Sequence, residues 1–362
     1  MTATPFRTIV VGAGTVSDLW LPELVARPDA QVVAVVEVDP ALARRAMARH
    51  GFESPVHEGV ATAIAETGAD LVVNLTPPAH HHAISLISLE RGCHVFTEKP
   101  MAATLVEAYD LIATANAAGR TLAVMQQFRY MRGSRLLRDG IAEGRIGRLE
   151  FVAADYFTAP FFDGFRHQMD HPLLLEMAIH TFDQARFFTA ADAISVYCHE
   201  FNPRGSRYRG DAAAVATFEL SDGSTFSYRG SWAANGCPTS WYSSWRVVGD
   251  RGTVTWDGAG DPHAETLAGS NSVDSKSLSL PVEPTAWAAS SDVLEGHPAC
   301  LADLFASLLD GTPPPTDCTD NLQSLAMVLA ATESAQRKER VEVDDLLRAA
   351  KAAAASTGSK RM

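Results

Sequence analysis

The sequence predicts an α/β protein: a doubly wound parallel sheet at the N-terminus, followed by an α/β domain with an open, mostly antiparallel sheet. Three observations indicate this class. Short apolar strands alternate with helical segments over residues 1–125, which is the pattern of a parallel sheet. A glycine-rich turn separates the first strand from the first helix. Beyond residue 126, closely spaced strands with turn signals between them indicate an antiparallel sheet.

Residues 1–125 form the first predicted domain. Its strands are short and β-branched, and its helices carry apolar residues at helical spacing. We predict strands at 8–11, 31–36, 71–75, 93–97 and 121–125, and helices at 19–25, 40–49, 58–66, 80–89 and 105–117. The segment Thr76-Pro77-Pro78 ends the third strand, because proline cannot donate to a ladder. Ligands of such sheets bind beyond the carboxyl ends of the strands, and Lys99 follows one of those ends.

Residues 126–346 form the second predicted domain, and residues 347–362 form a tail that we expect to fray. We predict helices at 134–143, 173–188, 292–309 and 320–336, and strands at 148–156, 194–201, 212–220, 224–232, 244–248 and 252–256. Residues 257–291 are rich in Gly, Ser, Asp and Pro, which predicts a long loop with little regular structure.

Composition limits the partners and the compartment. A chain of 362 residues with 46% hydrophobic residues can bury a large core, and its net charge of -13 argues against nucleic acid or an anionic membrane as a partner. The five cysteines are scattered, with no CxxC pair or zinc spacing, which favours a reducing cytoplasm. The first residues lack the pattern of a secretory signal, and no stretch is long enough to span a bilayer.

The glycine-rich turn, from Gly12 to Ser17, reads GxGxxG with serine at the third glycine. Gly12 and Gly14 permit a tight turn and a close approach of a pyrophosphate to the N-terminus of a helix. Glu37 ends the next strand, about twenty residues on, where a carboxylate would bind both adenosine ribose hydroxyls and repel a 2'-phosphate. The pattern therefore predicts a Rossmann domain that prefers NAD to NADP. The alternative is that Glu37 is a solvated carboxylate, and Arg44 and Arg45 on the next helix are the residues that would accommodate NADP.

Five segments of the sequence resemble the glucose-fructose oxidoreductase, inositol dehydrogenase and rhizopine-catabolism (Gfo/Idh/MocA) family over nearly the whole chain. They are VVGAGTVS at 10–17, TPPAHH at 76–81, ERGCHVFTEKP at 90–100, EGRIG at 143–147 and LEMAIHTFDQAR at 175–186. The resemblance implies NAD(P)-dependent oxidation or reduction of CH-OH groups of polyols, inositols or sugars. It also implies a homodimer or homotetramer that packs through the sheet of the C-terminal domain.

The turn, the strand ends and the family resemblance together predict the site residues. For the cofactor we predict Gly12, Gly14, Thr15, Val16, Glu37, Thr76, Pro77, His81, Glu98 and Lys99. For the substrate we predict Lys99, Arg129, Tyr156, Arg166, Glu176 and His180, with the aromatic residues near Arg166 either lining the pocket or packing in the core.

Hydride transfer from a carbon that bears a hydroxyl needs a base for the hydroxyl proton and a donor that stabilises the developing alkoxide. Lys99 is the predicted donor. Glu176, His180 and Asp183 stand at i, i+4 and i+7, which places them on one helix face. The resemblance implies that His180 is the catalytic base and that aspartate is usual where this chain has Glu176, which we predict to orient His180 or bind substrate. Lys99 and His180 would then act as one catalytic unit, contributed by both domains.

Other interpretations remain open at this point. A glycoside-processing enzyme with tightly bound NAD, which oxidises a ring carbon transiently, needs the same Lys99 and His180. A nucleotide-sensing regulator without turnover does not. Three adjacent histidines, from His80 to His82, cannot all converge on one ion from a helix start. Nothing else in the sequence clearly completes a metal site at the helix face that carries His180, so we predict no metal.

Overall fold

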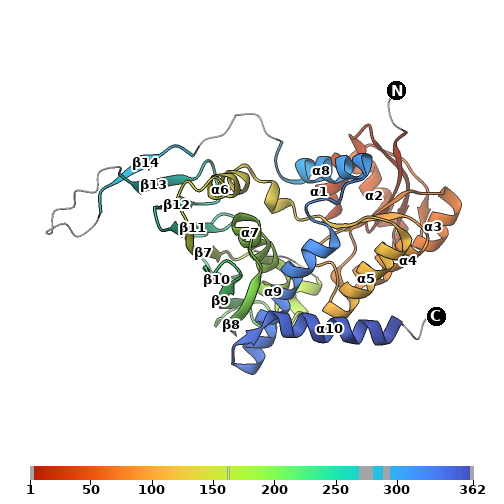
Figure 1. The fold of residues 1–362 in the computed structure, drawn as a ribbon. Coiled ribbons are helices and arrows are strands. Elements are labelled where there is room, and N and C mark those ends of the chain that lie inside the picture. Colours follow the sequence, from red (N-terminus) through yellow and green to blue (C-terminus); the bar gives the residue numbers. More distant parts are fainter. Residues whose placement is uncertain (1–3, 161, 163, 269–279, 288–293, 359–362) are drawn as a thin grey trace. The chain divides into compact units, whose positions relative to one another are not determined.

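The computed structural model describes residues 4–160, 162, 164–268, 280–287 and 294–358 (Figure 1). The chain divides into two compact units. The first unit comprises Met1–Gln127, Leu294–Leu325 and Leu347–Met362. The second unit comprises Phe128–Val293 and Ala326–Leu346.

The first unit is built on a six-stranded sheet with the order β3-β2-β1-β4-β5-β6, in which every pair is parallel. The strands are β1 (Phe6–Val11), β2 (Ala30–Val36), β3 (Val56–His57), β4 (Leu71–Asn74), β5 (His94–Thr97) and β6 (Leu122–Val124). This is the order of the doubly wound dinucleotide-binding fold, in which the strand order reverses between β1 and β4. The sheet and its order confirm the predicted Rossmann architecture of this unit.

Helices connect these strands, and their ends follow the capping chemistry of the sequence. They are α1 (Ser17–Val25), α2 (Pro40–His50), α3 (Val60–Thr67), α4 (His81–Glu90) and α5 (Leu105–Ala118). Thr104 and Glu107 form a reciprocal capping box at the start of α5, and Gly119 ends that helix in the left-handed conformation. Gly51 and Gly68 end α2 and α3 in the same way. The first unit also contains α8 (Gly296–Asp310).

The second unit is built on a nine-stranded sheet with the order β14-β13-β12-β11-β7-β10-β9-β8-β15. Its strands are β7 (Leu149–Phe157), β8 (Ala193–Phe201), β9 (Ala213–Leu220), β10 (Thr225–Ser231), β11 (Ser244–Gly249), β12 (Gly252–Trp256), β13 (His263–Leu267), β14 (Val282–Thr285) and β15 (Val341–Glu342). The β7–β10 pair is parallel and the other pairs are antiparallel. The predicted open, mostly antiparallel sheet is confirmed.

The two faces of this sheet differ. Buried and exposed residues alternate along β8 and β9, so one face forms a core and the other is open to solvent. On the core face, Phe182 of α7 (Ile179–Thr189) packs edge-on against Phe218, Phe226 and Tyr228. Helix α7 therefore packs on the core face of the sheet, and α6 (Arg132–Ala142) packs beside α7.

One prediction about an irregular segment is wrong. Within the predicted loop at 257–291, β13 and β14 form a hairpin at the edge of the sheet; residues 269–279 and 288–291 lie outside the described residues. His263-Ala264-Glu265 has poor strand propensity, but pairing with β12 overrides it. Residues 347–358 of the predicted tail belong to α10 (Val343–Gly358), since alanine is the best helix former. The first two residues of the helix predicted at 292–309 lie outside the described residues.

Among the described residues, the chain passes from one unit to the other in the short 3-10 segment Gln127–Tyr130, in α9 (Cys318–Arg337) and in α10 (Val343–Gly358). No helix among the described residues combines the length and the apolar composition that crossing a membrane requires.

Candidate active site

The glycine turn of the first unit has the shape that a pyrophosphate requires. Gly12 has φ of +94°, and a Cβ there would lie 2.9 Å from the carbonyl carbon of Leu75. Gly14 faces open space, with no atom within 4 Å of where its Cβ would be. Ser17 donates from its hydroxyl to the carbonyl of Gly14, at 2.7 Å, and so fixes the entry into α1. The turn, with Thr15 and Val16 in it, thus leaves room for phosphates at the N-terminus of α1.

Glu37 is held at the carboxyl end of β2. Its Oε2 accepts from the backbone N–H of Ala13, at 2.9 Å, and its Oε1 accepts from that of Asp39, at 3.2 Å. Val38, which follows it, is 83% exposed, and Arg45 of α2 pairs with Asp39 at 3.7 Å. The carboxylate therefore lies against the glycine turn, where an adenosine ribose is bound in folds of this kind.

His81 joins two of the predicted cofactor segments. Its Nε2 lies 2.7 Å from the carbonyl oxygen of Thr76, and its Nδ1 lies 2.6 Å from that of Pro100. The imidazole is buried, and the Lys99-Pro100 peptide bond is cis. The Thr76-Pro77 turn after β4 and the segment after β5 are thereby held together, within the same edge of the sheet.

Glu98 and Lys99 follow β5 at that edge. Glu98 is buried and accepts a hydrogen bond from the indole of Trp20 in α1, whereas Lys99 is half-buried. Sequence reasoning missed Trp20, because a large aromatic residue in an apolar helix carries no signal that distinguishes it from ordinary core.

In the second unit, a π-helical turn, Leu174–Ala178, leads directly into α7. Glu176 lies in the π turn, and His180 and Asp183 lie in α7; all three are buried. The imidazole of His180 stacks on Phe128, with ring centroids 4.2 Å apart and 16° between the planes. π turns often occur at functional sites. Of the three predicted ionisable residues, this turn contains Glu176, and His180 follows it closely in α7.

Arg166 comes from the 3-10 segment Phe165–Gln168 and pairs with Glu176. Its Nε donates to Glu176 Oε2 at 2.7 Å, with side-chain exposures of 21% and 3%. Phe162 and Phe165 hold the guanidinium, with ring centroids 5.3 and 4.7 Å from its central carbon. The structure thus brings together two predicted substrate residues and the aromatic residues beside them.

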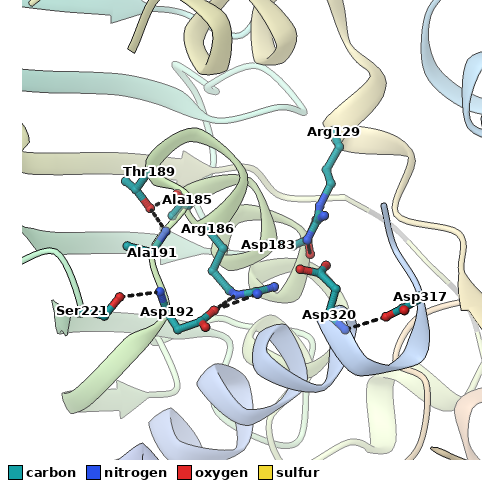
Figure 2. A network of polar contacts seen from close by, with 10 residues as sticks. All are labelled: Arg129, Asp183, Ala185, Arg186, Thr189, Ala191, Asp192, Ser221, Asp317 and Asp320. Atoms are coloured by element: carbon teal, nitrogen blue, oxygen red, sulfur yellow. Dashed lines mark hydrogen bonds and ion pairs between the residues drawn. The ribbon is translucent and has the colours of Figure 1, made fainter. Parts of the chain in front are cut away.

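Arg129 and Asp183 form a buried ion pair (Figure 2). Nε and Nη2 of Arg129 donate to the two oxygens of Asp183 at 2.6 Å each, with side-chain exposures of 6% and 1%. Phe128 precedes Arg129, and His180 lies one turn before Asp183. The pair therefore holds the segment that carries Phe128 against the helix that carries His180.

Tyr156 lies in the core of the second unit, with no exposed surface. Burial raises the pKa of its hydroxyl to about 12, and the indole of Trp232 donates to that hydroxyl at 3.4 Å. The ring also meets Trp241 edge-on, at 5.9 Å between centroids. Tyr156 and Arg129 both lie beneath the surface of their unit.

No group of three or more His, Cys, Asp or Glu side chains in the described part of the chain is placed to hold a metal ion. Asp183, which shares a helix with His180, has both carboxylate oxygens bound by Arg129.

Comparisons with known proteins agree with these features. Residues 6–126 match the model of an oxidoreductase family with an NAD-binding Rossmann fold, and residues 134–255 match that of the GFO/IDH/MocA C-terminal domain. The uncharacterized protein y4oX of Sinorhizobium fredii is 27% identical over 94% of this chain and 97% of its own. The D-glucoside 3-dehydrogenase of Escherichia coli is 28% identical over 57% of this chain and 61% of its own.

Solved structures share the fold. An oxidoreductase from Agrobacterium radiobacter, crystallised with NAD+, L-tartaric acid and magnesium, has a TM-score of 0.81 at 20% identity, and the match covers 95% of this chain and all of that one. At this identity the likeness establishes the two-sheet fold.

Proposed function

The chain belongs to the Gfo/Idh/MocA family of NAD-binding oxidoreductases, and we propose that it transfers a hydride between NAD and a hydroxyl-bearing carbon of a polyol, inositol or sugar. The observation that carries this proposal is the grouping on one helical segment: Glu176 and His180 are buried one turn apart, and Arg166 reaches the first of them from an aromatic loop. Buried ionisable residues cost stability, so a set of them in one place needs a chemical reason.

NAD, when bound, supplies the hydride acceptor. In the proposal it is held by Gly12, Gly14, Thr15, Val16, Glu37, Thr76, Pro77, Glu98 and Lys99, with His81 tying two of these segments together. The fit is supported by the open space at Gly14 and by the carboxylate of Glu37 beside the turn.

His180 is the proposed general base. Its ring is fixed by stacking on Phe128, and the neutral imidazole takes the proton from the substrate hydroxyl. Lys99 is the proposed electrostatic partner, because its ammonium stabilises the alkoxide that develops as His180 takes the hydroxyl proton, and from whose carbon the hydride then leaves. Substituting either residue should impair turnover, since His180 must accept a proton and Lys99 must carry a positive charge.

Arg166 and Glu176 are the proposed substrate-binding pair. A guanidinium carries donors on three nitrogens and a carboxylate carries two acceptor oxygens, and here the two groups meet at Arg166 Nε. Donors and acceptors side by side suit the vicinal hydroxyls of a polyol, and Phe162 offers an apolar surface next to them. Tyr156 and Arg129 are buried in the same unit, and we propose that they support this pair from within the core.

A substrate panel tests the proposal. The purified protein is mixed with free NAD and with polyols, inositols, aldoses and glycosides in turn, and NADH is followed by its absorbance. The proposal expects NADH with at least one compound. Turnover of an aryl glycoside without net NADH would favour transient ring oxidation by tightly held NAD. Binding of NAD without any turnover would favour a nucleotide-sensing regulator.

We further propose a homodimer or homotetramer in the cytoplasm. Ile194, Tyr197 and Phe201 of β8 and Val215 of β9 expose large apolar side chains on the open face of the second sheet, which supports burial against another copy. All five cysteines lie in the described residues and form no disulfide, as suits a reducing compartment.

Light scattering measures the mass of the assembly directly. Tyr197→Lys is expected to lower that mass, because it places a charge in the proposed interface. Leu309→Lys, at an exposed apolar position of α8 in the other unit, is the matched control and should leave the mass unchanged. A monomeric wild type would contradict the proposal.

A further inference from the structure

The indole of Trp20 makes a short hydrogen bond to a buried carboxylate. Trp20 Nε1 donates to Glu98 Oε1 at 2.6 Å, across 78 positions of sequence. The indole is 1% exposed and Glu98 is 8% exposed, so water cannot replace either partner. A hydrogen bond to a charged acceptor in a buried place is among the stronger kinds.

The second oxygen of the same carboxylate reaches the backbone of Lys99. Glu98 Oε2 accepts from the Lys99 N–H at 3.1 Å. On the other side of Lys99, the carbonyl of Pro100 lies 2.6 Å from His81 Nδ1. The backbone around the lysine is therefore held from both directions, just beyond the end of β5.

Trp20 is itself fixed from outside by α8. His297, in the first turn of that helix, packs its ring edge-on against the indole, with centroids 4.5 Å apart. Burial lowers the pKa of His297 from 6.5 to about 4, so the ring is neutral at ordinary pH. Its Nε2 is buried and has no hydrogen-bond partner among the described residues. The imidazole thus serves as a packing surface that keeps the indole N–H directed at Glu98.

We propose that Trp20 is a positioning residue, which acts through Glu98 to fix the backbone of Lys99 and hence the direction of its ammonium. The inference rests on the proposed role of Lys99 in hydride transfer. Without the indole donor, the carboxylate of Glu98 loses a buried hydrogen bond and shifts toward its other donors. The Lys99 N–H then loses its acceptor.

Hydrogen exchange of the Lys99 amide tests the contact without any substrate. Trp20→Phe keeps an aromatic ring in α1 and removes only the N–H donor and the larger ring. The exchange rate of the Lys99 amide is expected to rise about tenfold or more in the variant, while the amides of Val95 and Phe96 in β5 stay protected. An unchanged rate at Lys99 overturns the proposal.

Kinetics test the consequence. Trp20→Phe and Glu98→Gln are each expected to lower kcat about tenfold or more. Because Glu98 is itself among the proposed cofactor residues, the NAD dissociation constant is compared for Trp20→Phe, where calorimetry should find less than a threefold change. The double variant should be no slower than the slower single variant, since both substitutions act on the same chain of hydrogen bonds, from Trp20 through Glu98 to the Lys99 N–H. Additive losses, or a kcat within twofold of wild type in Trp20→Phe, would overturn the proposal.

Trp287→Phe is the matched control. Trp287 is also buried, and its indole donates one hydrogen bond, to the carbonyl of Leu136 at 2.8 Å in the second unit. This variant should lose similar thermal stability and keep its kcat and its Lys99 exchange rate. An equal loss of kcat in both variants would mean a general structural effect and would refute the positioning role. The Lys99 amide could exchange faster in Trp20→Phe even if the protein oxidised no polyol or sugar. That result would support the Trp20–Glu98–Lys99 contact and would contradict only the proposed function.

Discussion

Asp183→Asn is expected to destabilise the second unit strongly. The substitution keeps the shape of the side chain but removes the charge that faces Arg129, whose guanidinium is only 6% exposed. Removing one partner of a buried ion pair costs about 3–5 kcal/mol, because the charge that remains buried loses a counter-charge. Asparagine still accepts one hydrogen bond, so we expect the lower end of that range, about 3 kcal/mol.

An exposed pair in the same sheet domain provides the matched control. Arg229 donates through Nε to Asp155 Oδ1 at 2.7 Å, and its Nη2 pairs with Oδ2, so the bidentate geometry repeats that of the buried pair. The side chains are 60% and 31% exposed, and pairs of this kind contribute at most about 1 kcal/mol. Asp155→Asn is therefore expected to cost at least about 2 kcal/mol less than Asp183→Asn.

The assay is urea unfolding followed by circular dichroism at neutral pH, with the slope of the transition compared between variants to check that both unfold alike. Asp183→Asn is also expected to lower kcat, since Arg129 holds Phe128 against His180. Equal stability losses in the two variants would refute the reasoning, because burial would then make no difference to the pair.

Four further outcomes are expected. Glu37→Ala should reduce the preference for NAD over NADP, which we expect to be at least about tenfold in the specificity constant of the wild type; equal constants for both cofactors in the wild type would contradict this. Lys99→Ala and His180→Ala should each lower kcat about a hundredfold, and the double variant should be scarcely slower than the slower single variant in a kinetic cycle at saturating NAD. Because the folded pKa of His297 lies near 4, below the unfolded value of 6.5, unfolding takes up a proton as pH falls through that window, and stability present above pH 6.5 is lost toward pH 4. Discounted for partial exposure, that loss is about 2 kcal/mol, and it should be absent from the unfolding curves of His297→Phe. Glu176→Asp should raise KM for the substrate more than it lowers kcat, because the shorter carboxylate no longer reaches Arg166; a hundredfold fall in kcat at constant KM would instead make Glu176 a direct partner in proton transfer.

The first sheet could be predicted from the sequence because its signals are local. Apolar runs of strand length, the glycine turn and capping residues such as Thr104 each act over a few positions, and together they specify helix-linked parallel strands. The edge hairpin of β13 and β14 carries no such signal. Its backbone is ordered by pairing with a neighbouring strand, and residues such as Glu265 reveal nothing of that in isolation.

The candidate site was predictable only as far as its residues lie in recognisable motifs. Lys99 and His180 stand in segments with a family resemblance, and Glu37 stands at a fixed distance from the glycines. The contact of Trp20 with Glu98 joins positions that are distant in the sequence, and neither residue type indicates the other. The π turn before α7 was equally hidden, since the segment around Glu176 is almost entirely apolar and no residue type in it marks a π turn.

At position 176 this chain has glutamate, whereas the family resemblance implies aspartate. The usual aspartate has one methylene fewer, and here the longer side chain accepts from Arg166 at 2.7 Å. The guanidinium of Arg166 lies over the rings of Phe162 and Phe165, which belong to the same loop. Among the described residues, these two rings make cation–π contacts with Arg166 only. The glutamate, the arginine and the two rings are therefore linked by direct contacts, from the carboxylate to the guanidinium and from the guanidinium to the rings. We propose that the exchange of aspartate for glutamate changes what the site recognises, because the longer side chain brings its carboxylate to Arg166, a proposed substrate-binding residue.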